Sequence, residues 1–258
     1  MKLTFIGCGS AGTTPDYWQS NLLIEKNGKR FLIDFGCSMQ FALQELGLKP
    51  KDIEAYFFTH GHADHVGGIE DIAFGTHFIP GHPRPKLFGI GNMIPELWAK
   101  SASYGLESIQ GKINLLEDYF EPYPVKPNEG FNWERIVFQP VQACHIMNGF
   151  KLMDSYGLLL LDMDDPNATS VFFTGDTQFA PAQLTDFYDQ ADLIFHDCET
   201  LPYPSRVHAH YEDLKKLPVE TKKKMWLYHY QPKPPQIPVE DGFHGFVSKG
   251  QSFQIGEV

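Results

Sequence analysis

Residues 55–68 read AYFFTHGHADHVGG, an apolar run followed by a glycine-rich loop. Four side chains that commonly bind metals lie within six positions of this loop: His60, His62, Asp64 and His65. The apolar run predicts the end of a strand, and the loop glycines allow several ligands to converge. Imidazole nitrogens with a carboxylate oxygen suit zinc, with manganese or iron as alternatives. The pairs His60/His62 and Asp64/His65 can therefore each hold a separate ion.

Two ions need more ligands than this loop supplies. Three other predicted strand ends carry a histidine or an aspartate beside small residues: His145, Asp176 and His229. The candidate ligands are then five histidines and two aspartates. If Asp176 bridges, each ion receives three further ligands, and room remains for a shared water.

The length and composition of the chain limit its class. With 258 residues, of which 42% are hydrophobic, the chain is long enough for one sizeable α/β domain, expected to span residues 1–258. It has no apolar stretch of about 18 residues and no signal-peptide pattern, which predicts a soluble, cytoplasmic protein without a membrane partner. Four scattered cysteines fit a reducing compartment better than a disulfide framework.

The chain is acidic, with 21 basic and 32 acidic residues and a formal net charge of −11. Such a surface repels polyanions unless basic residues gather on one face. The one cationic run, Lys215-Lys216 followed by Lys222-Lys223-Lys224, is more typical of a solvated face than of a phosphate-binding track. A large nucleic acid is therefore not expected as a partner.

Apolar runs and their periodicity predict strands alternating with helices. The predicted strands are residues 3–6, 21–24, 31–34, 56–58, 86–88, 136–139, 158–161, 171–174, 193–195 and 226–228. The predicted helices are residues 39–46, 67–74, 94–102, 182–188 and 211–217. The first half is rich in hairpins and the second alternates strand with helix. This order favours two sheets with helices on their outer faces.

The segment Gly7-Cys8-Gly9-Ser10-Ala11-Gly12 matches the G-x-G-x-x-G pattern of dinucleotide-binding proteins. A dinucleotide site needs a helix that starts at those glycines, but Thr13-Thr14-Pro15-Asp16 would break it. We therefore interpret the glycines as a tight turn whose backbone passes beneath a neighbouring site.

The chain resembles proteins of the metallo-β-lactamase fold in the order of its motifs: H-x-H-x-D-H, a later histidine, a G-D-T aspartate and a last histidine. The opening segments FIGCGSAG and LLIEKNGKRFLIDFG resemble the start of that family as well. The resemblance implies an α/β fold, an αββα sandwich of two mixed sheets flanked by helices, with two zinc ions per chain or manganese instead. It implies these ligands: His60, His62 and His145 for one ion, Asp64, His65 and His229 for the other, and Asp176 as the bridge.

The sequence around the motifs resembles the phosphodiesterase branch that includes ribonuclease Z. The middle histidine lies in QACHIMNGF, whereas lactamase-like and glyoxalase-like members carry T-P-G-H. The segments LIFHDCET, RVHAHYEDLKKL and LYHYQ look like that branch, in which an acidic residue pairs with a histidine that protonates the leaving oxygen. By this resemblance His208 aligns as the acid, with His210 as a rival, and Asp197 aligns as its partner ahead of Glu199. The ligand Asp64 is also expected to serve catalysis.

Two phosphodiester substrates compete. Ribonuclease Z enzymes carry a long arm between the middle histidine and the bridging aspartate, but here that interval is 31 positions, 176 minus 145. Two strands and the acidic turn at residues 162–165 fill most of it, and acidic residues are the wrong sign for RNA.

The compact chain resembles the anti-Pycsar cyclic-nucleotide phosphodiesterases of phages and bacteria, which implies a 3′,5′-cyclic nucleotide substrate, immune evasion in the host cytoplasm, and a homodimer. Transfer-RNA 3′-end processing and a non-catalytic metal-binding scaffold are the alternatives.

In the implied mechanism a water attacks phosphorus in line and His208 protonates the departing ribose oxygen. The base contacts are expected from residues 74–104, which are rich in glycine, proline and aromatic residues.

Overall fold

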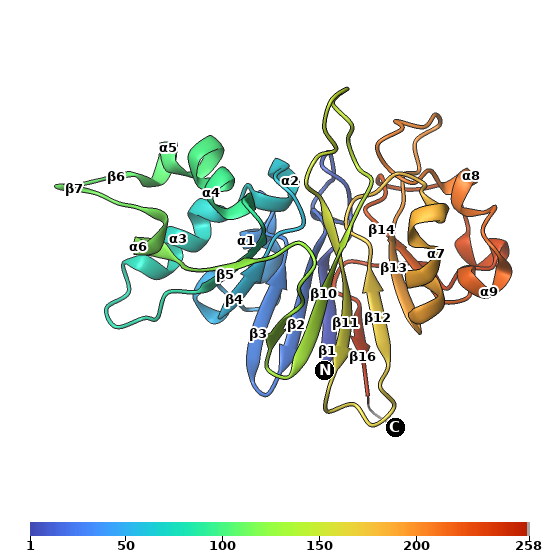
Figure 1. Cartoon of the computed structure of the whole chain (residues 1–258), viewed down its shortest axis with the longest axis horizontal. Helices are drawn as coiled ribbons and strands as arrows, with labels where there is room; N and C mark the ends of the chain where they lie inside the picture. The colour runs from blue at the N-terminus through green and yellow to red at the C-terminus, as the bar shows by residue number, and fades with distance from the viewer. Residues whose placement is uncertain (257–258) are drawn as a thin grey trace.

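The computed structural model describes residues 1–256 and shows two seven-stranded mixed sheets packed face to face, with helices on both outer faces (Figure 1). The first sheet has the order β16-β1-β2-β3-β4-β5-β8. In that order its strands are Ser252–Gln254, Lys2–Gly7, Asn21–Lys26, Lys29–Ile33, Ala55–Phe57, Lys86–Ile90 and Glu121–Val125. The second sheet has the order β15-β14-β13-β12-β11-β10-β9. Its strands are Gly245–Phe246, Met225–Tyr228, Leu193–Asp197, Ser170–Phe173, Tyr156–Asp162, Ile136–Gln142 and Phe131–Trp133. The predicted αββα sandwich is confirmed.

The helices divide between the two outer layers (Figure 1). On the side of the first sheet lie α1 (Met39–Glu45), α2 (Ala63–Val66), α3 (Ile69–His77), α4 (Met93–Leu97), α5 (Ser103–Leu106) and α6 (Leu116–Tyr119). On the side of the second sheet lie α7 (Pro181–Gln190), α8 (Tyr211–Leu214) and α9 (Val219–Lys222). Short 3₁₀ turns at Pro50–Asp52 and Pro238–Asp241, a π-helical turn η2 at Trp98–Ala102 and a small ribbon of β6 (Ser108–Ile109) and β7 (Lys112–Ile113) complete the elements.

Aromatic side chains fill the space between the sheets. Phe31 of the first sheet packs on Phe138 of the second with ring centroids 5.0 Å apart, and Phe131 stacks on Phe138 at 4.8 Å. Phe5 and Phe195 also contact each other across the sandwich, with tilted rings whose centroids are 4.8 Å apart. Because the inward positions of the predicted strands are apolar on both sheets, each sheet buries one face against the other.

Strand direction brings the loops with candidate ligands to one edge of the sandwich. β3 and β4 are parallel, and so are β12, β13 and β14. β10 runs antiparallel to β11, which runs antiparallel to β12, so β10 ends at the same edge as β12. The carboxyl ends of these strands therefore share one edge, where ligand sites of α/β proteins form.

All ten predicted strands are present, but some boundaries and elements differ. The predicted helix at residues 211–217 ends at Leu214, because the chain turns before Pro218. The helical pattern at residues 94–102 divides into α4 and the π-helical turn. The edge strands β8, β9, β15 and β16 were not predicted, since they are short or contain proline. Within residues 1–256 no helix is long and apolar enough to cross a membrane.

The acidic turn at residues 162–165 lies at the opposite edge from the candidate ligands. Asp162 ends β11 and pairs with Ile136 at the start of β10, whereas His145 follows the end of β10. Asp162 also forms ion pairs with Lys26 and with the N-terminal amine of Met1. The turn thus lies away from the candidate ligands, and its unfavourable charge for RNA stays a prediction.

Candidate metal centre

The predicted ligands all follow the carboxyl ends of strands. The loop after β4 carries His60 and His62, and α2, which begins directly after this loop, carries Asp64 and His65. The other three follow strands of the second sheet: His145 after β10, Asp176 after β12 and His229 after β14. Five of the seven side chains are buried, because the strand ends of the two sheets converge at this edge. These five are His60, His65, His145, Asp176 and His229.

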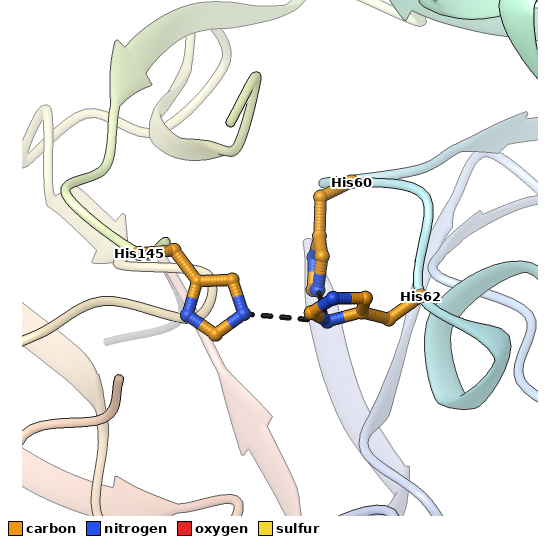
Figure 2. Close-up of side chains that lie close together, drawn as sticks. All are labelled: His60, His62 and His145. Carbon is orange, nitrogen blue, oxygen red and sulfur yellow. Dashed lines mark hydrogen bonds between the residues drawn. The ribbon is translucent and has the colours of Figure 1, made fainter. Parts of the chain in front are cut away.

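The first group of side chains consists of His60, His62 and His145 (Figure 2). His62 Nδ1 lies 2.8 Å from His60 Nε2 and 3.3 Å from His145 Nε2. His145 comes from the second sheet and faces the two histidines of the first-sheet loop, as Figure 2 shows. Three imidazole nitrogens from both sheets thus point at one place.

The second group consists of Asp64, His65, Asp176 and His229. Asp64 Oδ2 lies 3.3 Å from His65 Nε2 and 3.4 Å from His229 Nε2. Asp176 Oδ2 lies 3.2 Å from His65 Nε2 and 3.5 Å from His229 Nε2. The arrangement brings two carboxylates and two imidazoles around a second centre.

Asp176 lies between the two groups. Besides its contacts in the second group, its Oδ2 is 3.8 Å from His60 Nε2 and 3.9 Å from His145 Nε2. The side chain is almost completely buried, and its other oxygen, Oδ1, has no hydrogen-bond partner. A buried carboxylate oxygen without a partner is costly, so this position calls for a cation.

Hydrogen bonds on the far side of the rings orient two of the histidines. His145 Nδ1 donates to the Val207 carbonyl at 2.7 Å, and His65 Nδ1 donates to Asp34 Oδ2 at 2.7 Å. A neutral imidazole that donates through Nδ1 carries a lone pair on Nε2, which is the form that binds a metal. Both Nε2 atoms point into the centre, and His65 Nε2 is buried without a hydrogen-bond partner. These residues therefore fit divalent metal ions.

Burial and the neighbouring charges set the protonation of the histidines. Burial lowers the pKa of His60, His62 and His145 below the usual value of an imidazole. At the second group burial has the same tendency, but nearby carboxylates, first of all Asp176, outweigh it and raise the pKa of His65 and that of His229, the latter to about 10. The first group is thus a neutral imidazole site, and the second attracts positive charge.

No lysine or arginine within residues 1–256 forms an ion pair with the carboxylates of this edge: Asp34, Asp64, Asp176 and Asp197. The charged or chargeable partners of these carboxylates are histidines, and neutral donors add to them, such as Thr59 at Asp34 and the Thr177 N–H at Asp197. Since buried carboxylates are normally paired with a cation, the absence of basic side chains favours a site for metal ions.

Sequence reasoning missed Asp34, which directly follows β3 and is buried. Its carboxylate accepts from the Thr59 backbone N–H at 2.7 Å and from the Thr59 hydroxyl at 3.0 Å, in addition to His65. Asp34 has a positive φ of 62°, and so does His229, at 64°. Side chains other than glycine rarely adopt this conformation, which is found at functional sites. The sequence offered one indication of this role: Asp34 directly follows the apolar run Phe31-Leu32-Ile33, at a predicted strand end.

The predicted pair His208 and Asp197 lies beside the second group. His208 Nδ1 is 2.9 Å from Asp197 Oδ2 and 3.8 Å from Asp176 Oδ2. Burial disfavours a charged His208, but Asp197 outweighs that effect and raises the pKa of His208. Asp197 Oδ1 also lies 3.4 Å from His229 Nδ1. Asp197 thus hydrogen-bonds His208 and lies beside the His229 ring without a hydrogen bond to it.

The rival pair has other contacts. The His210 ring caps α8, with Nδ1 accepting from the Glu212 N–H, and its Nε2 donates to the Leu201 carbonyl at 2.9 Å. Glu199 accepts from the Ser205 N–H at 2.7 Å. Both side chains support the loop that carries His208, and neither belongs to the groups around Asp176.

The glycine turn near the N-terminus passes beside the last histidine, as predicted. His229 N–H donates to the Cys8 carbonyl at 2.7 Å, and the Ser10 N–H donates to the Tyr230 carbonyl. A Cβ at Gly9 would lie 2.2 Å from Thr13 Oγ1, so only glycine allows this close packing.

A family model described as "Anti-Pycsar protein Apyc1" matches residues 1–253. The chain belongs to this family. An anti-Pycsar protein Apyc1 from Paenibacillus harenae is 35% identical over 234 residues, which cover 89% of this chain and 90% of the relative. Another, from Bacillus phage vB_BveM-Goe7, is 30% identical over 238 residues and covers 89% of this chain and 88% of its own length.

Solved structures share the fold at lower identity. The metallo-β-lactamase fold protein YhfI from Bacillus subtilis superposes with a TM-score of 0.73 at 15% identity, covering 98% of this chain and 99% of that chain. The short form of human tRNase Z has a TM-score of 0.70 at 16% identity and covers 99% of both chains. These structures show that this member of the Apyc1 family has the metallo-β-lactamase fold.

In this Apyc1 family member a cavity of about 540 Å³ opens beside the first group of histidines. His62 and Gly61 line it from the ligand loop, and residues 93–101 line one side, within the range predicted to contact a base. Residues 146–154, which directly follow His145 and were not predicted to contribute, line it as well. The candidate metal centre thus adjoins a space large enough for a small ligand.

Proposed function

We propose that this chain is a phosphodiesterase that uses two metal ions and hydrolyses 3′,5′-cyclic nucleotides to nucleoside monophosphates. One observation carries the proposal: Asp176 Oδ2 lies within 3.9 Å of imidazoles from two separate ligand groups and within 3.8 Å of His208. A shared carboxylate with a histidine beside it is the arrangement expected for phosphoryl hydrolysis.

The residues divide the ions between them. His60, His62 and His145 would hold one ion and Asp64, His65 and His229 the other, with Asp176 shared. Zinc suits these nitrogen and oxygen ligands, and manganese is the alternative. When bound, the ions neutralise the phosphate oxygens and make a water nucleophilic at neutral pH.

The chain's own groups then handle the proton. Hydrolysis adds a water oxygen to phosphorus and breaks one phosphorus–oxygen bond to the ribose, so the leaving oxygen needs a proton. His208 would donate that proton, and Asp197, 2.9 Å from its Nδ1, holds the ring beside Asp176 and favours its charged form. Asp64 contributes by positioning the second ion beside His229.

The family and the charge pattern favour a small substrate. The relatives are anti-Pycsar proteins, some of them from phages. The resemblance to such proteins implies degradation of cyclic nucleotides. The lysines at residues 215–224 do not form a phosphate track: Lys216 pairs with Asp213, and Lys223 pairs with Glu220. One phosphate held by metal needs no such track, whereas transfer RNA does.

The proposal extends to the setting of the enzyme. We propose a cytoplasmic homodimer that removes cyclic-nucleotide signals of antiphage immunity, in the host cytoplasm if a phage encodes it; the phage relatives support the immune-evasion part of this proposal. Sedimentation of the purified chain checks the dimer.

Incubation with a panel of cyclic mononucleotides and a precursor transfer RNA, across a salt series, tests the substrate class. We expect nucleoside monophosphates on chromatography with shallow salt dependence, and an intact RNA. Efficient 3′-end cleavage of the RNA with untouched cyclic nucleotides would instead make the chain a ribonuclease Z. No turnover of either would favour a scaffold.

A further inference from the structure

The cavity beside His62 has two walls from distant parts of the sequence. Residues 93–101 form one wall, and residues 146–154, here called the His145 hairpin, form the other. His62, a ligand candidate, belongs to the lining as well, so the cavity is continuous with the metal centre. A substrate whose phosphate lies at the metals can reach into this space without leaving the site.

The first wall combines an apolar surface with an unusual turn. Met93 and Leu97 are buried side chains that face the cavity. Directly after them the helix widens into the π-helical turn η2, which places Lys100 and Ser101 on the rim. π-helical turns are rare and occur mainly at functional sites.

The His145 hairpin is held in place at its tip and its base. At the tip, Asn148 Oδ1 accepts from the backbone N–H groups of Phe150 and Lys151, at 3.1 and 2.9 Å. Nearer the base, the Met153 N–H donates to the Ile146 carbonyl at 2.8 Å. These hydrogen bonds leave the Asn148 amide nitrogen, among the described residues, without a partner and on the cavity lining.

The charges around the cavity cancel. Lys100 pairs with Glu96 at 2.6 Å, and Lys151 pairs with Asp154 at 2.8 Å, and all four residues line the cavity. A second phosphate would find no free cation there. An uncharged ring with hydrogen-bonding edges fits better, because it can pack on Met93 and Leu97 while Asn148 and Ser101 contact its polar atoms.

We infer that this cavity binds the nucleobase and that the His145 hairpin and the π-helical turn determine base preference. The inference rests on the proposed function, since it places the phosphate at the metal centre.

The substitution Ser101→Trp fills the cavity from its rim, and Asn148→Ala removes the amide. Ala99→Trp, on the exposed side of the same turn, is the matched control, because Ala99 does not line the cavity. Each variant is assayed with the preferred cyclic nucleotide and with 1-O-methylribose 3′,5′-cyclic phosphate, which lacks the base.

We expect Ser101→Trp to raise KM for the cyclic nucleotide by at least about tenfold, the order of a lost base-packing contact, and Asn148→Ala to change the ranking of bases. Turnover of the base-free compound and the Ala99→Trp control should stay at the wild-type level. Equal losses on both substrates, or no loss on either, would overturn the inference. Failure of the wild type to open either cyclic compound would overturn the proposed function and this inference with it.

Discussion

The two ends of the sandwich differ in how their buried carboxylates are paired. At the edge formed by the ends of β3, β4, β10 and β12 to β14, Asp64 and Asp176 meet histidines but no lysine or arginine among the described residues. At the other edge, Asp162 is 3% exposed and is ion-paired with Lys26 and with the N-terminal amine, the latter at 3.2 Å. One cluster lacks a cation, and the other contains its own.

This difference distinguishes a binding site from a structural ion pair. Burial makes an unpaired carboxylate costly in both places, so each cluster needs positive charge. Where the chain provides that charge, the cluster serves stability. Where it provides only imidazoles with their lone pairs directed inward, an external cation completes it. Substitutions at the two ends should therefore affect different properties.

The largest expected effect is that of Asp176→Ala, which should abolish hydrolysis of the preferred cyclic nucleotide. This carboxylate is the only one placed between both ligand groups within residues 1–256, so its loss removes the spacing that positions the reacting water. Activity assays with circular dichroism check that the chain stays folded. Asp186→Ala, an exposed change in α7, is the control, and near-normal turnover by Asp176→Ala would remove Asp176 from the centre.

The next effect is that of His208→Ala, which should lower kcat by roughly 10² to 10⁴, the usual contribution of general acid catalysis. Metal content should stay the same if His208 is the acid, because all seven expected ligands remain. A fall in metal content would show that His208 acts as a ligand in its cluster with Asp176, Asp197 and His229. His210→Ala is the matched variant and should chiefly affect stability, since its ring caps α8. If His210→Ala produced the loss in kcat and His208→Ala did not, the roles would be exchanged.

A smaller effect is expected for Asp34→Asn, which should weaken metal binding by about 10- to 100-fold, the usual cost of losing a partner of a ligating histidine. Asparagine tolerates the left-handed backbone that Asp34 adopts, so the change tests the carboxylate and not the fold. Competition with a chelator of known affinity measures the change. Unaltered affinity would show that Asp34 does not orient His65.

The smallest effect on function is expected at the opposite end. Asp162→Asn should lower the free energy of unfolding by about 3 kcal/mol, because it breaks a buried ion pair, while kcat and metal content stay unchanged. Urea unfolding at pH 7 measures this loss. A fall in kcat would show that the two ends are not independent.

The same variant has a defined pH dependence. Burial favours the neutral acid, but Lys26 outweighs it and holds the pKa of Asp162 below its usual value. The stability that Asp162 contributes is therefore complete above the usual carboxyl pKa and disappears as the pH falls through the lower, folded value. The difference between wild type and variant should stay constant from pH 7 to about pH 4 and shrink below that pH.

The fold and the ligand edge could be predicted because they depend on local patterns. Apolar runs of three to seven residues mark the inner strands, and H-x-H-x-D-H after such a run marks a loop with convergent ligands. Chain direction then brings His145, Asp176 and His229 to the same edge. Their roles as ligands remain predictions that the substitutions above test.

Other features depend on tertiary contacts and left little trace in the sequence. Asp34 is one aspartate among many until its bonds to Thr59 and His65 are seen. The His145 hairpin follows from the Asn148 turn, which a polar loop does not reveal. The distance of the acidic turn at residues 162–165 from the candidate ligands follows from strand direction, which charge alone does not reveal. The single-domain organisation and the homodimer stay predictions.

Metal content tests the central claim most directly. The chain, purified without added chelator and loaded with zinc or manganese, is desalted and analysed by elemental mass spectrometry beside Asp176→Ala and Asp162→Asn. We expect close to two ions per chain in the wild type and in Asp162→Asn, and fewer in Asp176→Ala. A fully active wild type with no bound metal, or equal metal content in all three proteins, would contradict the account.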